Sequence, residues 1–420
     1  MEALNKKIVS VALVLSSLVI FTGCKTDDSG KFSFHAEKTG SIYYGYTFQE
    51  DSIMVTTTHM LVSDWDTEGF DYLCSDASCQ HDSEDCSAYI SEDINAGANL
   101  ALVYGDKTII FQSYTESTNG QEDEDTIWNH KYYTNIYEAD LLGENRTLKK
   151  TIEGGLMENC IPRDSIICGQ YLILGLSKSL KQTDSYTEVD GELVTETSYE
   201  YSEEVLAIDL ESFDTYSLIE KSDMDCVGSS TTQFYLSGEY LYCVMCDSMN
   251  ELNEAEDGFQ NYYSLYCMKE GESSFTLLTQ YKEDESVTRS FVGAIGETYF
   301  YETDNEIHKV TDGEDTIFYS SEEACSAGIY DDYIVISDQY TCDDTGLYNG
   351  MTCEWYNVSG ELLDTYTYDS YFCFMEDLND RLIICYPFEE KQEWWISKDE
   401  IRSDLSSAVY IGPFVGLMVE

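Results

Sequence analysis

A short motif that recurs along the chain constrains its fold more than any other feature. Each copy has Gly, Asp or Asn at a turn, then Asp, Glu or Gln, and then a run of strand-forming residues. The six copies begin at Gly105, Gly169, Gly238, Gly296, Asp331 and Asn379. Their starts are 64, 69, 58, 35 and 48 residues apart, so the core unit is short and the longer units carry insertions. Repetition at this period is typical of solenoids, propellers and arrays.

A second predicted strand follows each copy of the motif. These second strands occupy 135–141, 205–210, 264–268, 306–310, 353–358 and 393–397. A weaker first copy lies in 41–74, where 53–57 and 60–65 form the two strands. The sequence therefore predicts about seven units, with a range of six to eight.

The composition favours an all-β protein. The chain has 35 tyrosines and only 3 prolines, and tyrosine suits half-buried strands. Short strands without intervening helices, repeated in small units, predict a β-propeller in which each sheet buries its faces against its neighbours. A pair of β-sandwiches is the alternative fold. The polar insertions are expected to be loops on the propeller faces, at 112–129, 177–201, 248–261 and 339–351.

The N-terminus has the pattern of an export signal. Lys6 and Lys7 precede an apolar run at 8–21 that is too short to span a membrane. The run ends in Phe-Thr-Gly-Cys24, which resembles the lipobox of bacterial lipoproteins and implies that Cys24 is lipidated. We therefore expect a signal peptide at 1–23, a lipidated cysteine and linker at 24–38, and one propeller domain at 39–420. An ordinary secretory signal is the alternative interpretation.

The whole chain resembles a family of bacterial lipoprotein β-propellers from gut-type Gram-positive bacteria, with a pattern related to WD40-like and TolB-like propellers. The resemblance lies in the lipobox, the repeated Gly-x-Tyr-Leu-Tyr strands and the Cys/His segment 73–86. The resemblance implies a lipid-anchored domain on the outer face of the cytoplasmic membrane. It does not imply any particular activity. The six copies of the repeated motif do not carry the Trp-Asp signature of WD40 blades.

One compact cluster has the residue types of a metal site. Cys74, Cys79, His81 and Cys86 fall within 13 residues, in a C-x4-C-x-H-x4-C pattern. Three thiolates and one imidazole complete a tetrahedral zinc set, and a set without an open position is structural. The spacing differs from the usual C-x2-C knuckle. A disulfide with a spare thiol is the alternative, because oxidising compartments favour disulfides.

Other candidate residues give weaker signals. The remaining cysteines lie in strand patterns and are expected to be buried thiols, and Cys243 with Cys246 lacks the helix N-terminus of a redox motif. Asp64, Asp66 and Glu68 begin like a calcium loop, but Ser75 stands where a bidentate Glu is required. We interpret this segment as a turn and keep calcium as a weak candidate. No sequence motif identifies a catalytic residue.

The formal net charge of −59 limits the partners. Nucleic-acid binding needs a basic face, so nucleic acid is excluded, and the membrane is expected to be contacted only through the N-terminal lipid. We predict a surface binding or scaffold module for a glycan, peptide or envelope protein, and lean against an enzyme. The alternative is a carboxylate-dependent hydrolase acting on polysaccharide. The sequence gives no oligomeric state.

Overall fold

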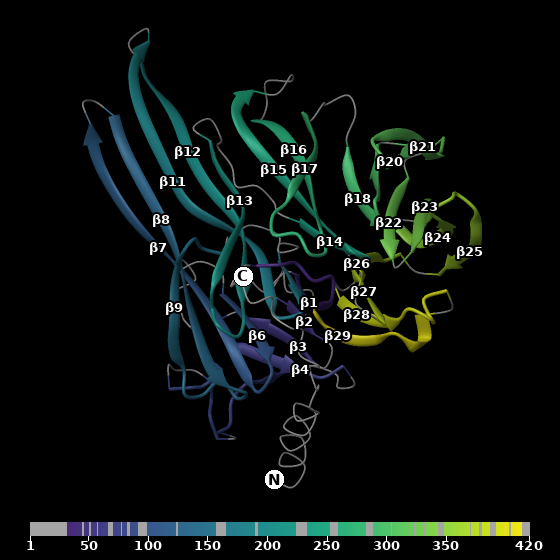
Figure 1. Ribbon diagram of the computed structural model, residues 1–420, viewed down its shortest axis with the longest axis horizontal. Coiled ribbons are helices and arrows are strands. Elements are labelled where there is room, and N and C mark those ends of the chain that lie inside the picture. Colours follow the sequence, from purple (N-terminus) through teal and green to yellow (C-terminus); the bar gives the residue numbers. More distant parts are fainter. Residues whose placement is uncertain are drawn as a thin grey trace. The chain divides into compact units, whose positions relative to one another are not determined.

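The computed structural model describes the chain from residue 32 to residue 413, apart from short gaps (Figure 1). The gaps are 44–45, 50–51, 57, 66–69, 77, 82–84, 91–98, 123–124, 157–164, 190–191, 224–232, 253–258, 283–288, 304, 323–324, 331, 343–347, 370, 378–379, 387–391 and 403–404. The described elements are β-strands, with one 3-10 turn at Leu405–Ser407. They form two compact units, Met1–Ser229 with Gly271–Ser274, and Ser230–Glu270 with Phe275–Glu420.

The second unit contains four sheets of four antiparallel strands, each sheet following the chain order. The first two sheets are β14 (Gln233–Ser237), β15 (Tyr240–Leu252), β16 (Phe259–Lys269) and β17 (Thr276–Lys282), then β18 (Ser290–Ile295), β19 (Thr298–Glu302), β20 (Glu306–Thr311) and β21 (Glu314–Ser320). The last two are β22 (Ser326–Tyr330), β23 (Tyr333–Cys342), β24 (Tyr348–Asn357) and β25 (Leu362–Tyr368), then β26 (Cys373–Asp377), β27 (Arg381–Tyr386), β28 (Gln392–Ser397) and β29 (Val409–Pro413).

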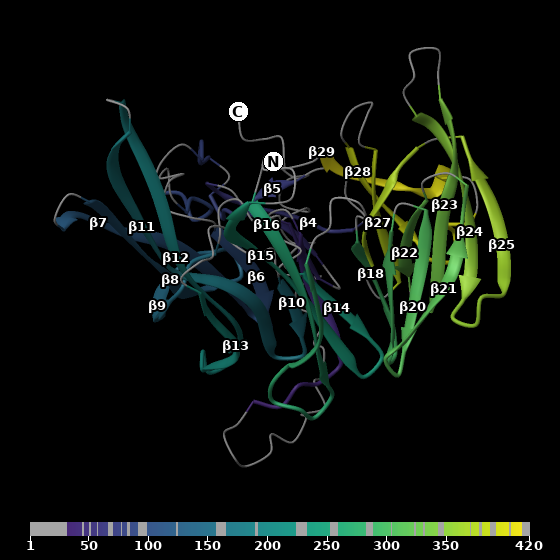
Figure 2. The same cartoon turned by 90° about the horizontal axis from the view of Figure 1, so that it is seen from above.

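Each sheet of the second unit packs on the next one along the chain. Tyr242 of the first sheet shares a core cluster with Ala294 of the second. Phe300 of the second sheet packs with Ile334 of the third, and Trp355 of the third shares its cluster with the fourth sheet. Figure 2 shows the strands of the later sheets running alongside one another. Four-stranded meanders that bury their faces against sequence neighbours are the blades of a β-propeller.

The first unit has three meanders joined into one branched sheet of 13 strands. The first meander is β1 (Lys38–Tyr43), β2 (Tyr46–Gln49), β3 (Ile53–Thr56), β4 (Met60–Ser63) and β5 (Asp71–Tyr72). The second is β6 (Asn99–Tyr104), β7 (Lys107–Glu122), β8 (Asp125–Asp140) and β9 (Thr147–Glu153), and the third is β10 (Ser165–Cys168), β11 (Tyr171–Val189), β12 (Glu192–Asp209) and β13 (Thr215–Asp223). Pairing of β1 with β10, and of β11 with β8, joins the meanders.

The three meanders of the first unit also stack in chain order. Met54 and Met60 of the first meander pack with Ile110 of the second. Phe111, on the opposite face of the same strand, packs with Leu174 of the third. Successive residues of a strand point to opposite faces, so β7 contributes to both clusters. The all-β, propeller-like fold predicted from the sequence is therefore confirmed, whereas the number of blades and the single domain at 39–420 stay predictions.

The repeated motif has the same place in every meander that it marks. Its copies begin or precede β7, β11, β15, β19, β23 and β27, the second strand of each of these meanders. The predicted partner strands lie in β8, β12, β16, β20, β24 and β28, the third strand of each. Several of the motif glycines, such as Gly105 at φ 63°, adopt a left-handed conformation that other residues rarely adopt.

The prediction that the polar insertions are loops is wrong. Most of each insertion continues the two flanking strands as a long hairpin, so that β7 pairs with β8 from Lys107 to Glu122 and β11 pairs with β12 from Tyr171 to Val189. Figure 1 shows these four strands lying side by side. Their Thr and Tyr residues favour strands, but the polar and acidic residues between them made the composition resemble that of loops.

The predicted signal peptide at 1–23 and the lipidation site Cys24 lie outside the described residues. The end of the predicted linker is described, and its Phe34 exchanges backbone hydrogen bonds with Gly271 and Glu272. Among the residues that the structure describes, no helix has the length and apolar character needed to cross a membrane.

Candidate metal centre and ligand cavity

The four residues of the predicted metal cluster come together in the segment between β5 and β6. One ligand atom from each of Cys74, Cys79, His81 and Cys86 lies within 4.8 Å of every other. Cys86 is buried and the other three are half-buried. All three cysteines are free thiols. The chain could therefore hold a metal ion with three sulfur ligands and one nitrogen ligand.

The local backbone directs these ligands toward one point. The backbone N–H of Cys79 donates to Asp76 O at 3.0 Å, which closes a tight turn. His81 has a left-handed φ of 59°. Its N–H donates to Cys79 Sγ at 3.4 Å, and its Nδ1 lies 3.2 Å from Cys86 Sγ. The imidazole stacks on Tyr72 at a centroid distance of 4.1 Å, so the ring orientation is fixed by packing.

The surrounding structure holds the cluster segment against the first two meanders. The N–H of Leu73 donates to Met60 O at 3.0 Å, and the N–H of Met60 donates to Ala88 O at 2.8 Å. The Arg146 guanidinium donates to Gly143 O at 3.1 Å and to Ser87 O. Strand β4 and the turn after β8 thus fix both ends of the segment.

The thiols of the cluster differ in their pKa values. Burial raises the pKa of Cys86 to about 11, despite backbone hydrogen bonds from Ala88 and Tyr89 that favour the thiolate. Burial also acts to raise the pKa of Cys74, but hydrogen bonds with Asp76, Ser87 and the other two cysteines hold it below its usual value. Because thiolates are the metal-binding form, metal binding to this cluster releases protons.

Four cysteines outside the cluster agree with the prediction of buried thiols, and two do not. Cys168, Cys243, Cys325 and Cys353 are buried, whereas Cys246 and Cys267 are half-buried. Cys243 and Cys246 are three residues apart on β15, so their side chains point to opposite faces of the sheet and cannot act as a dithiol pair. Cys160 and Cys226 lie outside the described residues, as do Asp66 and Glu68 of the weak calcium candidate.

A cavity lies between the first two sheets of the second unit, and it is a feature that sequence reasoning missed. Its volume is about 230 Å³. Five of the thirteen lining residues are aromatic and two are charged: Val244, Tyr263, Ser264, Leu265, Thr279, Tyr281, Arg289, Phe291, Tyr299, Tyr301, Val310, Gly313 and Asp315. These residues come from β15 to β21, so no short sequence motif could have identified them.

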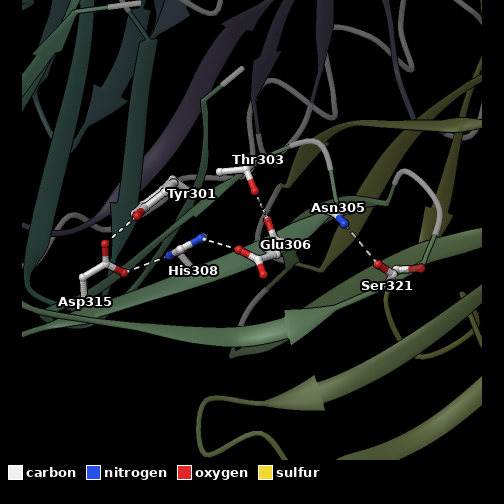
Figure 3. A network of polar contacts seen from close by, with 7 residues as sticks. All are labelled: Tyr301, Thr303, Asn305, Glu306, His308, Asp315 and Ser321. Carbon is white, nitrogen blue, oxygen red and sulfur yellow. Dashed lines mark hydrogen bonds and ion pairs between the residues drawn. The ribbon is translucent and has the colours of Figure 1, made fainter. Parts of the chain in front are cut away.

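The two charged groups of the cavity are held by different contacts. The Arg289 guanidinium carbon lies 5.0 Å from the centre of the Tyr301 ring and 5.6 Å from that of Tyr281. The Tyr301 hydroxyl donates to Asp315 Oδ2 at 2.5 Å, and His308 Nδ1 lies 3.0 Å from Asp315 Oδ1. His308 Nε2 is 3.3 Å from Glu306 Oε2, so a polar chain runs from the cavity along β20 (Figure 3).

This network changes the acidity of its members. Burial and the hydrogen bond to Asp315 raise the pKa of Tyr301, which therefore stays a hydroxyl donor at neutral pH. Burial opposes ionisation of Asp315, but hydrogen bonds from Tyr301 and His308, and the charges of His308 and Arg289, hold its pKa below the usual value. Asp315 is consequently a carboxylate acceptor at the cavity wall.

The sequence matches no protein-family model and no curated protein. Solved structures similar to the chain include a prolyl endopeptidase, at 8% identity and a TM-score of 0.43, covering 87% of this chain and 47% of that one. The WD40 domain of SCAP from fission yeast matches at 11% identity and a TM-score of 0.37, covering 88% and 85%. The β-propeller domain of the trilobed protease from Pyrococcus furiosus matches at 10% identity and a TM-score of 0.28, covering 67% and 92%. The chain spans about half the length of the prolyl endopeptidase.

Proposed function

We propose that the protein is a lipid-anchored surface protein whose propeller is a binding or scaffold module for a glycan, a peptide or an envelope protein. The cavity between β14–β17 and β18–β21 carries this proposal. It is concave, mostly apolar and lined by a few convergent polar groups, as small binding sites usually are. At about 230 Å³ it suits one unit of a larger ligand.

The surface location rests on the N-terminal sequence. Cys24 is the acylated residue in this proposal, and two acyl chains plus the attached lipid hold an acidic protein at the bilayer without basic side chains. In a bacterial host, wild type should fractionate with membranes and C24S should be released. A C24S protein that stays on the membrane would contradict the lipid anchor.

The binding function is tested with the full chain, purified in detergent, on panels of glycans, peptides and envelope extracts. Retention and product release are recorded together. Retention of a ligand without cleavage is expected. Retention on none of the three panels would overturn the proposal.

The polysaccharide hydrolase is the second candidate, and one observation favours it. Glu306 and Asp315 are bridged by His308 beside the cavity, and paired carboxylates are the usual groups of glycosidases. In that function Asp315 lies at the cavity wall, and Glu306, which does not line the cavity, orients His308. Product release that is abolished in both E306Q and D315N would replace the binding function with this one.

We further propose that the Cys/His cluster binds zinc as a structural ion. Three thiolates and one imidazole suit zinc, and four protein ligands leave no open position for catalysis. The expected content is about one zinc per chain. The ion is expected to be lost in C79S and H81S and kept in C168A, which removes a buried thiol of the same unit outside the cluster. Wild-type protein that lacks metal and contains a Cys74–Cys79 disulfide would support the alternative interpretation.

A further inference from the structure

We propose that the cavity of the second unit binds one neutral sugar ring of a glycan, with Arg289 donating to its hydroxyl groups and Asp315 accepting from them. This inference rests on the proposed binding function and names its ligand class and residues.

The walls have the chemistry of a sugar site. Five of the lining side chains are aromatic: Tyr263, Tyr281, Phe291, Tyr299 and Tyr301. Aromatic rings offer flat apolar surface to the C–H groups of a sugar, and tyrosine adds a hydroxyl at the ring edge. Because the Arg289 guanidinium lies over Tyr281 and Tyr301, this surface comes from the other three rings. The volume of about 230 Å³ lies below the range of drug-sized ligands, so the site takes one small ring and not an extended chain.

Arg289 supplies the donors. Its guanidinium lies over the rings of Tyr281 and Tyr301, and the Tyr281 hydroxyl donates to the Arg289 carbonyl at 3.1 Å, which holds the backbone of this residue. Within the described part of the chain, the guanidinium makes no ion pair. An arginine that stacks on aromatic rings keeps its N–H groups at the guanidinium edge, where they can donate to ligand hydroxyl groups.

Asp315 supplies the acceptors. One carboxylate oxygen accepts from Tyr301 at 2.5 Å and the other lies 3.0 Å from His308 Nδ1. An ionised carboxylate has about four lone-pair sites, so each oxygen retains capacity for a ligand hydroxyl. Because Tyr301 and His308 fix the carboxylate from two directions, its orientation is set before the ligand arrives, which reduces the entropy cost of binding.

The pairing of one cation with one carboxylate favours a neutral polyol over a charged ligand. A sugar hydroxyl is both donor and acceptor, so it can satisfy Arg289 and Asp315 together. An acidic sugar would meet Arg289 favourably but would face Asp315 and the net charge of −59. A cationic ligand would be attracted by Asp315 but repelled by Arg289.

The test uses calorimetry on the full chain in detergent, with hexasaccharides of glucose (α- and β-linked), mannose and galactose, and with a galacturonic acid hexamer as the acidic probe. R289Q and D315N should each weaken binding of a neutral hexasaccharide by about tenfold or more, since each leaves ligand hydroxyls without a charged partner. R402Q is the matched control. Arg402 lies over Tyr333 and Trp355 at 5.3 and 5.5 Å in the same unit, but it does not line the cavity.

The outcomes separate this inference from the function on which it rests. Binding of a neutral hexasaccharide that is lost in R289Q and D315N and kept in R402Q, with unchanged melting temperatures, supports both the cavity inference and the binding function. Neutral binding that survives R289Q and D315N overturns the cavity assignment and leaves the binding function standing. Preferential binding of the acidic hexamer overturns the ligand class. Binding of no hexasaccharide overturns the inference, and the peptide and envelope panels then decide the binding function.

Discussion

Gln49 forms two side-chain hydrogen bonds with the backbone of Val103, and these join the first two meanders of the first unit. Its Nε2 donates to Val103 O at 2.7 Å, and its Oε1 accepts from Val103 N–H at 2.9 Å. The amide thus pairs with a residue of β6 as another strand would. Thr47 and Thr56 do the same for Ala101, two residues earlier on β6.

Replacing Gln49 with Leu should therefore lower the free energy of unfolding by about 1–3 kcal/mol, because both backbone groups of Val103 lose their partners. Urea denaturation followed by tryptophan fluorescence measures the change. Gln49→Glu keeps the acceptor and loses the donor, so it should also destabilise, since a carboxylate then faces the Val103 carbonyl. Equal stability of Q49L and wild type would show that Gln49 makes no net contribution.

Alanine substitutions at Gly143 and Gly105 compare a crowded with an open position at two glycines that both have a left-handed backbone conformation. Gly143 has φ 74°, and an added Cβ would lie 2.7 Å from Met60 Cε and 3.0 Å from Ser87 O. Gly105 has φ 63° and nothing within 4 Å of the added atom. G105A should cost about 1–2 kcal/mol from backbone strain, and G143A at least about 1 kcal/mol more from crowding.

The same urea measurement distinguishes the two glycines. Because Ser87 follows Cys86 directly, G143A should also lower the metal content, whereas G105A should not. Equal costs for the two variants would mean that Met60 and the Ser87 carbonyl shift without penalty.

Glu302 should make stability depend on pH. It lies on β19 and accepts from Ala327 N–H on β22 at 3.0 Å, and burial raises its pKa above its usual value despite that hydrogen bond. At a pH between the unfolded and the folded pKa of Glu302, this carboxyl group is therefore protonated in the folded state and ionised in the unfolded state. Stability contributed by this group falls as pH rises from the unfolded pKa through the raised folded pKa.

Glu302→Gln keeps the acceptor and cannot ionise, so it should raise the melting temperature relative to wild type at pH 7 and have little effect at pH 4. Thermal unfolding followed by circular dichroism measures the difference. The exposed Glu314 of β21 provides a control, since E314Q should change the two melting temperatures by similar small amounts. A gain for E302Q that is as large at pH 4 as at pH 7 would exclude ionisation as its cause.

Removing the metal should weaken the first unit. A strong chelator is expected to release zinc and lower the melting temperature of wild type, because four ligands no longer share one ion. In H81S the chelator should change nothing, since the site is already incomplete. A chelator effect of equal size in wild type and H81S would place the relevant metal elsewhere.

The central strands of each sheet could be predicted from the sequence because they carry the strongest local signals. A turn residue followed by alternating apolar residues identified β7, β15 and β19, and the Cys/His spacing identified a cluster whose members do converge. In both cases the relevant contacts are made by residues close in sequence. The outer strands β14, β17 and β25 carry weaker patterns, and their pairing is seen only in the folded sheets.

The hairpin extensions and the cavity could not be predicted, for two physical reasons. Polar strands are distinguished from polar loops by their partners, and the outer part of β11 pairs on one edge with β12 and on the other edge with β8, about 50 residues earlier in the chain. The cavity depends on two sheets meeting, so Tyr263 and Tyr301 become neighbours of one space only after both sheets have formed.

The pairing of β1 with β10 sets a limit on the order in which the chain can assemble. Gly40 pairs with Ile167 of β10. The second edge of β1 is therefore covered only after more than a hundred further residues have been synthesised. Until then it presents backbone N–H and C=O groups that another chain can pair with. During synthesis from the N-terminus, the first meander is therefore exposed to intermolecular association until residues 165–168 have emerged.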